Sequence, residues 1–314
     1  MPSSKLTDLR TAVSTLVRDG DTVLIEGFTH LICFAAAHEI IRQRRRDLVL
    51  CRLTPDLVYD QMIAAGCARK LVFSWAGNPG AGSLHAFRRA VETGSPGSLP
   101  DGAPGGAPPL EIEEYSHFGM VARLCAGAAG LPFWPLRDYA GTDLPRVNGQ
   151  IREIECPFTG ERLAAVPALV PDVAILHAQR ADARGNAQIW GLLGMQREAA
   201  LAARRVIVVV EELVDESVIR ADPNRTAIPE LAVDAVVVEP WGAHPSFAQG
   251  YYDRDNDFYV GWEAISRDAA ALARWLDEWV HGCSGRAEYT ERMPVARERL
   301  RARPRMSGEV SYGY

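Results

Sequence analysis

Apolar positions at the start of the chain alternate between helical spacing and short continuous runs. The positions that share one helix face predict an N-terminal helix; they are Leu6, Leu9, Val13, Leu16 and Val17. The turn residues 19–21, DGD, precede the apolar run 22–25, which predicts a buried strand. A second helix is expected over residues 34–44 and a second buried strand over residues 48–53. The N-terminal region therefore predicts a strand, helix, strand unit.

The same alternation continues through most of the chain. Helices are expected over residues 56–66, 83–92, 119–130 and 196–203. Strands are expected over residues 70–75, 172–177, 205–211 and 235–238. Because helices and strands alternate in this way, the chain is predicted to have an α/β fold, with a mainly parallel sheet flanked by helices.

A Gly- and Pro-rich segment interrupts this pattern. Residues 93–109, TGSPGSLPDGAPGGAPP, contain too much Gly and Pro for a helix or strand, so we expect a flexible surface insertion within one domain.

The C-terminal region is predicted to contain one more helix. An apolar stripe from Trp262 to Trp279 predicts one long helix. The Arg-rich residues 283–314 show no periodicity and are expected to form a poorly ordered extension. The predicted organisation is one domain over residues 1–282, followed by this extension.

Charge and composition narrow the class of protein. Lys and Arg total 34 against 40 Asp and Glu, and no basic stripe is present, which argues against nucleic acid as a partner. The start of the chain does not resemble a signal peptide, and no apolar run is long enough for a membrane span, so we expect a cytoplasmic protein without a membrane partner. The six cysteines are scattered without a Cys-x-x-Cys pair, which argues against a disulfide framework and a metal site.

The first candidate site follows the predicted strand over residues 22–25. Ligands of open parallel sheets bind beyond the carboxyl ends of the strands, where glycine allows close approach to the backbone. We therefore predict that substrate contacts lie in this segment, at Glu26, Gly27, Phe28, Thr29 and His30. Pairing with an arginine or capping a helix is the alternative for Glu26. For His30, orienting a carboxylate or donating to a substrate oxygen competes with the role of a satisfied core histidine.

The strand over residues 70–75 should end at the same edge of the sheet. We expect four residues there to line the same crevice, with a core position as the alternative for the tryptophan: Ser74, Trp75, Gly77 and Asn78. The segment 77–82, GNPGAG, lacks the Lys-Ser/Thr pair of a P-loop and is a weak phosphate-binding signal.

Three further polar residues have competing interpretations. Ser116 is predicted either to bind substrate or to cap the following helix, the commoner fate of such a serine. Glu114 belongs to an acidic cluster whose simplest role is a solvated strand edge. His244, between Gly-Ala and Pro-Ser, is expected to be a structural turn residue.

Several motifs resemble those of family I CoA-transferases. Residues 19–28, DGDTVLIEGF, resemble the family's Asp-Gly, short apolar strand and Gly-Gly-Phe, with Glu26 in place of the first glycine. The Gly-Phe-x-His that follows, with His-Glu-Ile at 38–40, is similar to the glutaconate CoA-transferase A-subunit branch. Residues 172–188, DVAILHAQRADARGNAQ, are typical of the same family. Shorter matching segments lie at 113–116, 131–133, 141–143, 211–212, 242–246 and 250–253.

The resemblance implies a NagB/RpiA-like α/β fold and an enzyme built from A and B subunits, as a heterodimer or heterotetramer. In such enzymes a B-subunit glutamate, in a motif such as Ser-Glu-Asn-Gly, attacks an acyl-CoA and becomes a glutamyl-CoA thioester before CoA passes to a carboxylic acid. That motif does not occur in this chain, which would supply one wall of the site. Coenzyme A is then a substrate, and no permanently bound cofactor is expected.

On this basis we expect an alpha subunit that helps to move CoA between an acyl-CoA and a 3-oxo or dicarboxylic acid. A related branch of CoA-thioester ring-opening hydrolases is expected to use an A-subunit glutamate in this region, which makes Glu114 the candidate catalytic residue. The alternatives are a subunit of a heteromeric CoA-thioester or ring-opening C–C hydrolase and a non-catalytic binding module, which fold alone does not separate. A B subunit with the glutamate motif favours transfer, a B subunit without it favours hydrolysis, and the absence of a partner favours a binding module.

Overall fold

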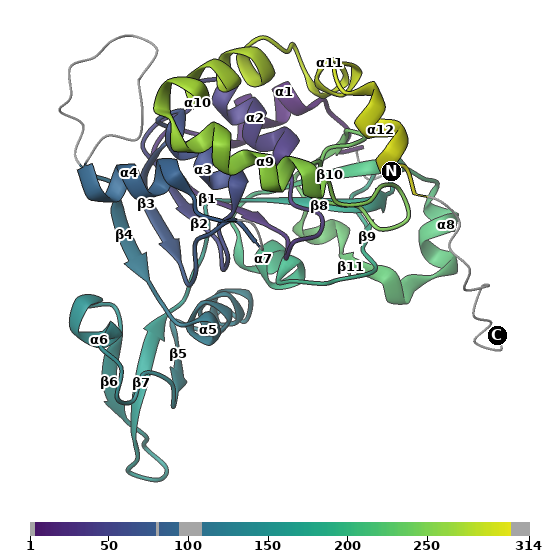
Figure 1. Ribbon diagram of the computed structural model, residues 1–314. Helices are drawn as coiled ribbons and strands as arrows, with labels where there is room; N and C mark the ends of the chain where they lie inside the picture. The colour runs from purple at the N-terminus through teal and green to yellow at the C-terminus, as the bar shows by residue number, and fades with distance from the viewer. Residues whose placement is uncertain (1–3, 80–81, 94–108, 303–314) are drawn as a thin grey trace.

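The computed structural model describes residues 4–79, 82–93 and 109–302. Within these residues, a nine-stranded sheet with helices on both faces forms the main body, and a three-stranded sheet projects from it (Figure 1). This confirms the predicted α/β fold class. The predicted flexible insertion falls almost entirely on residues 94–108, which lie outside the described residues, as does the end of the predicted extension at 303–314.

Seven neighbouring strands of the large sheet run parallel, in the order β12-β10-β8-β1-β2-β3-β4. Their bounds are β1 Thr22–Glu26, β2 Leu48–Cys51, β3 Ala68–Phe73, β4 Glu111–Glu114, β8 Val173–Ala181, β10 Val206–Leu213 and β12 Ala235–Val238. Two short antiparallel strands, β9 (Ala187–Gln188) and β11 (Thr226–Ile228), continue from the end of β8. All seven parallel strands therefore present their carboxyl ends at one edge of the sheet.

Helices cover both faces of this sheet (Figure 1). One face carries α1 (Leu9–Leu16), α2 (Phe34–Arg42), α3 (Leu57–Ala64), α4 (His85–Thr93), α9 (Asn256–Arg267) and α10 (Ala269–Leu276). The other face carries α5 (His117–Ala128) and α7 (Gln196–Ala202). The shorter helices are α6 (Leu144–Val147), α8 (Glu216–Ala221), α11 (Arg286–Glu291) and α12 (Pro294–Leu300).

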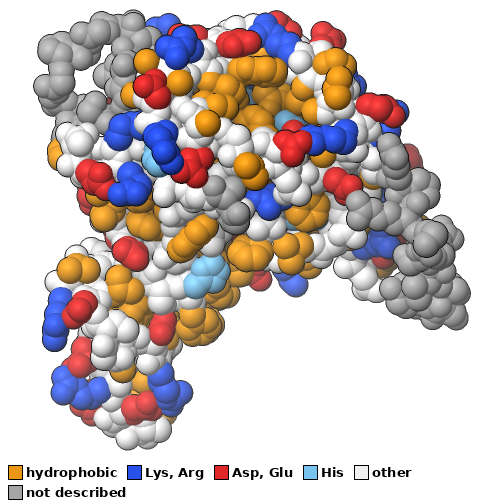
Figure 2. Space-filling view, viewed as in Figure 1, with side chains coloured by type: hydrophobic (Ala, Val, Ile, Leu, Met, Phe, Trp, Pro, Cys, Tyr) orange, Lys and Arg blue, Asp and Glu red, His pale blue; other side chains and the backbone are white. Residues whose placement is uncertain are grey.

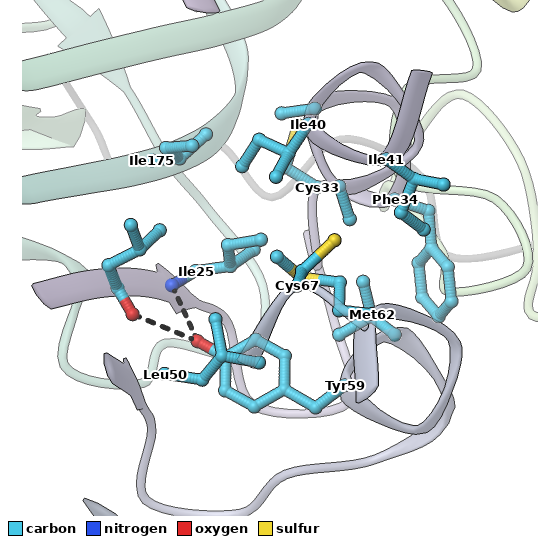
Figure 3. Packing of buried hydrophobic residues seen from close by; sticks show 14 of the residues in the cluster. Ile25, Cys33, Phe34, Ile40, Ile41, Leu50, Tyr59, Met62, Cys67 and Ile175 are labelled. Carbon is cyan, nitrogen blue, oxygen red and sulfur yellow. Dashed lines mark hydrogen bonds between the residues drawn. The ribbon is translucent and has the colours of Figure 1, made fainter. Parts of the chain in front are cut away.

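The central strands are mainly apolar because both of their faces are buried. In β1, Val23 and Ile25 pack into the cluster beneath α2 and α3, whereas Leu24 packs into the cluster on the opposite face. Figure 3 shows Ile25 beside Leu50 and Tyr59, with Cys33 and Met62 filling the space toward the helices. The buried cysteines therefore act as small apolar side chains.

A tyrosine links β1 to β2 where their regular pairing ends. The last paired residues are Leu24 and Cys51. Beyond them, the Tyr59 hydroxyl accepts a hydrogen bond from the Ile25 amide at 3.0 Å (Figure 3). It donates to the Cys51 carbonyl at 2.8 Å, which replaces the missing backbone bond. Tyr59 therefore lets the two strands separate at their carboxyl ends without leaving buried backbone groups unpaired.

The turn after β1 has an unusual backbone. Gly27 has a φ of +148°, and a Cβ at this position would lie 2.6 Å from the His30 carbonyl oxygen. Thr29 and Leu31 also have positive φ, of 56° and 55°. Because only glycine adopts such a conformation freely, Gly27 is required for the tight turn that leads from β1 into α2.

Two predictions about the C-terminal region are wrong. The apolar stripe from Trp262 to Trp279 is not one helix: the chain breaks at Asp268, whose side chain caps α10 by accepting from the Ala271 amide at 2.6 Å. Residues 286–300, within the expected poorly ordered extension, form α11 and α12. The buried Arg286 anchors α11 by donating to the Trp241 carbonyl at 2.8 Å, a contact between distant segments that local periodicity does not reveal.

The small sheet was not predicted from the sequence. Its strands are β5 (Phe133–Leu136), β6 (Arg152–Glu155) and β7 (Arg162–Pro167), paired antiparallel in the order β5-β7-β6. They are short and largely exposed, and charged side chains of both signs cover the tip of this sheet (Figure 2). Strands of this kind lack the apolar run or clean alternation from which strands are predicted.

Of the helices in the described part of the chain, none combines the length and apolar character needed to cross a membrane.

A buried carboxyl group should make folding stability depend on pH. Asp60 accepts from the Phe87 amide at 2.9 Å and from the Trp262 indole at 3.0 Å, and burial raises its pKa to about 6. Because the folded state holds this proton more tightly, the stabilisation is complete at low pH and is lost as the pH rises through about 6. Chemical denaturation of wild type and Asp60→Asn should show their stability difference falling by about 2 kcal/mol between about pH 4 and pH 7. A constant difference would contradict this.

Gly27→Ala should destabilise the protein strongly, since the new Cβ would overlap the His30 and Leu31 carbonyl oxygens and the backbone conformation is strained. We expect a loss of about 3 kcal/mol or more in unfolding free energy, measured by denaturant titration. Gly20→Ala is the matched control, because Gly20 has a φ of +83° but open space around its Cβ position, and should cost only about 1 kcal/mol. Equal losses in the two variants would show that the turn tolerates a side chain.

Candidate active site

The carboxyl ends of β1, β2, β3 and β4 lie side by side at one edge of the large sheet. The residues at or just beyond these ends are Glu26, Arg52, Ser74 and Glu114. Ligands of open α/β sheets bind outside this edge, beside the point where neighbouring strands separate. The edge is therefore the candidate active site, and the predicted site residues can be located against it.

Glu26 is a buried carboxyl group at the end of β1. One of its oxygens accepts from the Met195 amide at 3.3 Å, while Oε2 is buried without a hydrogen-bond partner among the described residues. Burial raises the pKa of Glu26, an effect opposed by the positive charge of Arg52. A carboxyl group with one oxygen free and a raised pKa is suited to share a proton with a ligand oxygen.

Arg52 holds the end of β1 in place. Its buried guanidinium pairs with Asp56 at 3.1 Å and donates to the Gly27 carbonyl, while its backbone amide donates to the Val72 carbonyl at 3.0 Å. Asp56 also accepts from the Val58 amide at 3.2 Å and so caps α3. This network fixes β1, β2 and α3 relative to one another. Arg52 was not predicted as a site residue because it lies inside the predicted strand 48–53, whereas β2 ends at Cys51; an arginine within an apolar run is the signal that could have found it.

Ser74 and His117 form a pair across the ends of β3 and β4. The Ser74 hydroxyl lies 2.5 Å from the Leu53 carbonyl oxygen and 2.9 Å from His117 Nδ1. The His117 ring also contacts Phe28 edge to face, with 6.4 Å between ring centroids. The structure therefore joins Ser74 and Phe28, which were predicted, to His117, which sequence analysis missed because it lies beside a predicted helix start.

Apolar side chains surround this pair. Trp75 is 48% exposed, so it is not a core residue, and Phe28 is 38% exposed. Gly194 lies against the turn after β1, since a Cβ on it would be 3.0 Å from a Glu26 carboxyl oxygen and 3.2 Å from the Phe28 Cβ. Three more exposed apolar residues are next to these positions in the sequence. Phe118 follows His117, and Leu192 and Leu193 precede Gly194. On the face shown in Figure 2, hydrophobic side chains gather where the main body meets the small sheet.

His30 has the role of a satisfied core histidine. Its Nδ1 lies 2.8 Å from the Leu192 carbonyl oxygen, and its Nε2 accepts from the Gln249 amide at 3.0 Å. The ring is fully buried, and burial lowers its pKa to about 4, which keeps it neutral. Thr29 contributes its carbonyl oxygen, which accepts from the Ser246 hydroxyl at 2.8 Å. Both ring nitrogens of His30 are occupied, so the expected donation to a substrate oxygen is not available in this structure.

Three other predicted residues are held by internal contacts. The buried Asn78 donates to the Tyr259 carbonyl at 2.7 Å, and the Gly77 amide donates to the Pro55 carbonyl at 3.2 Å. Ser116 caps α5 by accepting from the Gly119 amide at 2.9 Å, and its hydroxyl donates to Asp138. Ser116 therefore has the capping role that was the alternative to substrate binding.

Glu114 lines a surface cavity that is separate from the Ser74 and His117 pair. It is exposed at the end of the edge strand β4 and borders a cavity of about 280 Å³ with Lys70, Glu113 and the segment 147–150. Its carbonyl accepts from the Asn148 amide group at 2.7 Å. The structure thus gives Glu114 the exposed edge position, beside the segment that leads into the small sheet.

The buried groups near β8 and β10 serve packing. Glu211 accepts from the Tyr252 hydroxyl at 2.5 Å and from the Trp241 amide at 2.7 Å, and lies 2.7 Å from His177 Nε2. His244 lies 3.1 Å from both the Tyr289 hydroxyl and the Asp255 carboxylate, which agrees with its predicted structural role. Across the described ranges, no group of three or more His, Cys, Asp or Glu side chains is arranged to hold a metal ion.

Comparison with known proteins links this geometry to one family. The chain matches the family described as Coenzyme A transferase over residues 6–239. It is 54% identical over 286 residues to the A subunit of the 3-oxoadipate CoA-transferase of Pseudomonas knackmussii, covering 91% of this chain and 97% of that protein.

Solved structures support the same assignment. Glutaconate coenzyme A-transferase from Acidaminococcus fermentans superposes with a TM-score of 0.88 at 31% identity, covering 96% of each chain. The decarboxylase AibA/AibB superposes with a TM-score of 0.71 at 31% identity, covering 88% of this chain and 100% of that chain. The family match, the 54% identical relative and the shared fold together confirm the resemblance seen in the sequence: the chain belongs to the coenzyme A transferase family and is similar to its A subunits.

Proposed function

We propose that this chain is the A subunit of a two-subunit CoA-transferase that moves CoA from an acyl-CoA to a dicarboxylic 3-oxo acid, with 3-oxoadipate as the first candidate. The observation that carries this proposal is the 54% identity to the A subunit of a 3-oxoadipate CoA-transferase, which extends over 97% of that protein. The family match over residues 6–239 also spans the whole candidate site, from Glu26 to Gly194.

A partner subunit is part of the proposal because this chain lacks the Ser-Glu-Asn-Gly motif expected for the nucleophile. The partner's glutamate would attack the thioester carbonyl and release CoA thiolate, leaving an anhydride. The thiolate would then attack the glutamyl carbonyl, and the acyl group would leave as a carboxylate. In the second half of the cycle, the acceptor carboxylate would take CoA by the same steps in reverse. This chain would bind and orient the acids opposite that glutamate.

The exposed apolar side chains at the sheet edge favour this arrangement. Phe28, Trp75 and Phe118 are large and exposed around the Ser74 and His117 pair. A cluster of exposed aromatic side chains beside polar groups is typical of surfaces that another chain covers. Burial by the partner would also exclude water, which protects an anhydride or thioester from hydrolysis.

Glu26 has a proposed role as a neutral hydrogen-bonding group in the site. Its free Oε2 and raised pKa suit a protonated carboxyl that donates to an acyl or carboxylate oxygen. The carbonyl of Gly27 is fixed by Arg52, so the turn that follows Glu26 keeps its geometry when a ligand binds. Preorganised groups of this kind lower the cost of binding a reacting oxygen.

The purified chain by itself should show no CoA transfer, since the proposed nucleophile is on the partner. Co-expression with a B-type subunit should give a stable complex that forms 3-oxoadipyl-CoA from 3-oxoadipate and an acyl-CoA donor such as succinyl-CoA, measured by product chromatography. The matched control is a complex whose partner carries glutamine in place of the motif glutamate, which should assemble but not turn over.

Three other results would contradict parts of this proposal. Full activity of the isolated chain would exclude a partner nucleophile. A complex that releases free CoA and acid from acyl-CoA without transfer would indicate a hydrolase. A complex that transfers CoA only to monocarboxylic acids would contradict the proposed acceptor class while leaving the enzyme class intact.

A further inference from the structure

We propose that His117, oriented by Ser74, binds the second carboxylate of the dicarboxylic acid and so determines acceptor specificity. This inference rests on the proposed function, because it assigns a residue to the substrate class named there. It concerns the carboxylate that does not react, at the far end of the acid from the carbon that receives CoA.

The Ser74 hydroxyl determines which nitrogen of the His117 ring carries a proton. The hydroxyl has one hydrogen, and the Leu53 carbonyl oxygen at 2.5 Å can only accept it. The oxygen of Ser74 therefore presents only lone pairs to His117 Nδ1, 2.9 Å away, so Nδ1 carries a hydrogen and donates. This arrangement leaves Nε2 as the ring nitrogen available to a ligand.

The His117 ring is held on its other side as well. Phe28, from the turn after β1, contacts it edge to face at a centroid distance of 6.4 Å. The side chain is exposed, and Nε2 makes no hydrogen bond with any part of the chain that the structure describes. A ring fixed by a hydrogen bond and an aromatic contact, with one free nitrogen at the carboxyl ends of β3 and β4, is preorganised to bind a ligand.

A carboxylate is the ligand that this geometry favours. His117 is the first residue of α5, and its Nε2 is the ring nitrogen that Ser74 leaves without a partner. An imidazolium N–H donates to a carboxylate in a charge-assisted hydrogen bond, which is about twice as strong as a neutral one. The backbone amides in the first turn of α5 also favour an anion beside them.

Neither acid at this edge of the sheet opposes this assignment. Glu114 borders a separate cavity that His117 does not line, and Glu26 is buried, which raises its pKa and disfavours its negative charge. The exposed Phe28 and Trp75 present apolar surface that suits the methylene groups between the two carboxylates of the acid. The edge thus offers an imidazole at one end and an apolar middle to an extended dicarboxylic acid.

The test uses the assembled two-subunit complex and two acids of equal length. 3-Oxoadipate and 3-oxohexanoate share the reacting carboxylate and the 3-oxo group, but only the first has a carboxylate at the far end. We expect His117→Ala to lower kcat/KM for 3-oxoadipate about tenfold or more, mainly through KM, and to change kcat/KM for 3-oxohexanoate less than about twofold. His117→Gln should retain part of the preference because its amide group still donates.

Two further variants separate binding from structure. Ser74→Ala should lower the preference for 3-oxoadipate in the same direction but by less, about threefold, because the imidazole ring is still present but loses the hydrogen bond that orients it. His281→Ala is the control for removal of an exposed histidine, since His281 lies at the end of the turn 277–281 that packs against α2, and it should leave both acids unaffected. Equal losses for the two acids in His117→Ala, or no loss for either, would overturn the proposal.

Binding without turnover distinguishes this inference from the proposed function. Calorimetry with adipate and hexanoate on the same complexes should show weaker adipate binding in His117→Ala and no change for hexanoate. If the complex transfers no CoA but this difference is found, the carboxylate contact stands and the proposed reaction fails. If transfer to 3-oxoadipate occurs and adipate binds equally well to both proteins, the reaction stands and the role of His117 fails.

Discussion

The candidate site depends on how the chain fills the gap that opens between β1 and β2 at their carboxyl ends. Regular pairing stops at Leu24 and Cys51, and the Tyr59 hydroxyl then joins the two backbones. Beyond it, the buried guanidinium of Arg52 pairs with Asp56 and holds the Gly27 carbonyl. A buried cation left without these partners would cost roughly several kcal/mol, so the network fixes the strand ends firmly.

Because the strand ends are fixed, the sheet edge has buried residues that hold the loop and exposed residues that can meet a ligand. Glycine at position 27 accepts the positive φ of the turn after β1, which brings Phe28 to the surface beside His117. His30 faces inward, has both ring nitrogens in hydrogen bonds and is kept neutral by burial, so it supports the loop rather than meets a ligand. The exposed groups at this edge are His117 and a surrounding apolar surface, whereas the unpartnered Oε2 of Glu26 is buried.

Sequence patterns predicted the strands correctly where both faces of a strand are buried. The continuous apolar runs at 22–25, 48–53 and 205–211 became central strands because parallel strands covered on both faces need apolar residues throughout. Prediction failed where distant contacts decide the local structure. Helix α11 is anchored by Arg286 on the segment 241–244, and the strands of the small sheet are too exposed to show an apolar pattern.

Local patterns along the chain were enough to predict the fold class and the family and to name one sheet edge as the candidate site, because apolar periodicity and short motifs are properties of neighbouring residues. Ser74, Phe28 and Glu26 could be named for the same reason, since each ends or closely follows a predicted strand. Which side chains meet is a different matter, because that depends on how distant segments pack. Whether a histidine is satisfied, as His30 is, or free at one nitrogen, as His117 is, depends on partners more than 40 residues away in the chain.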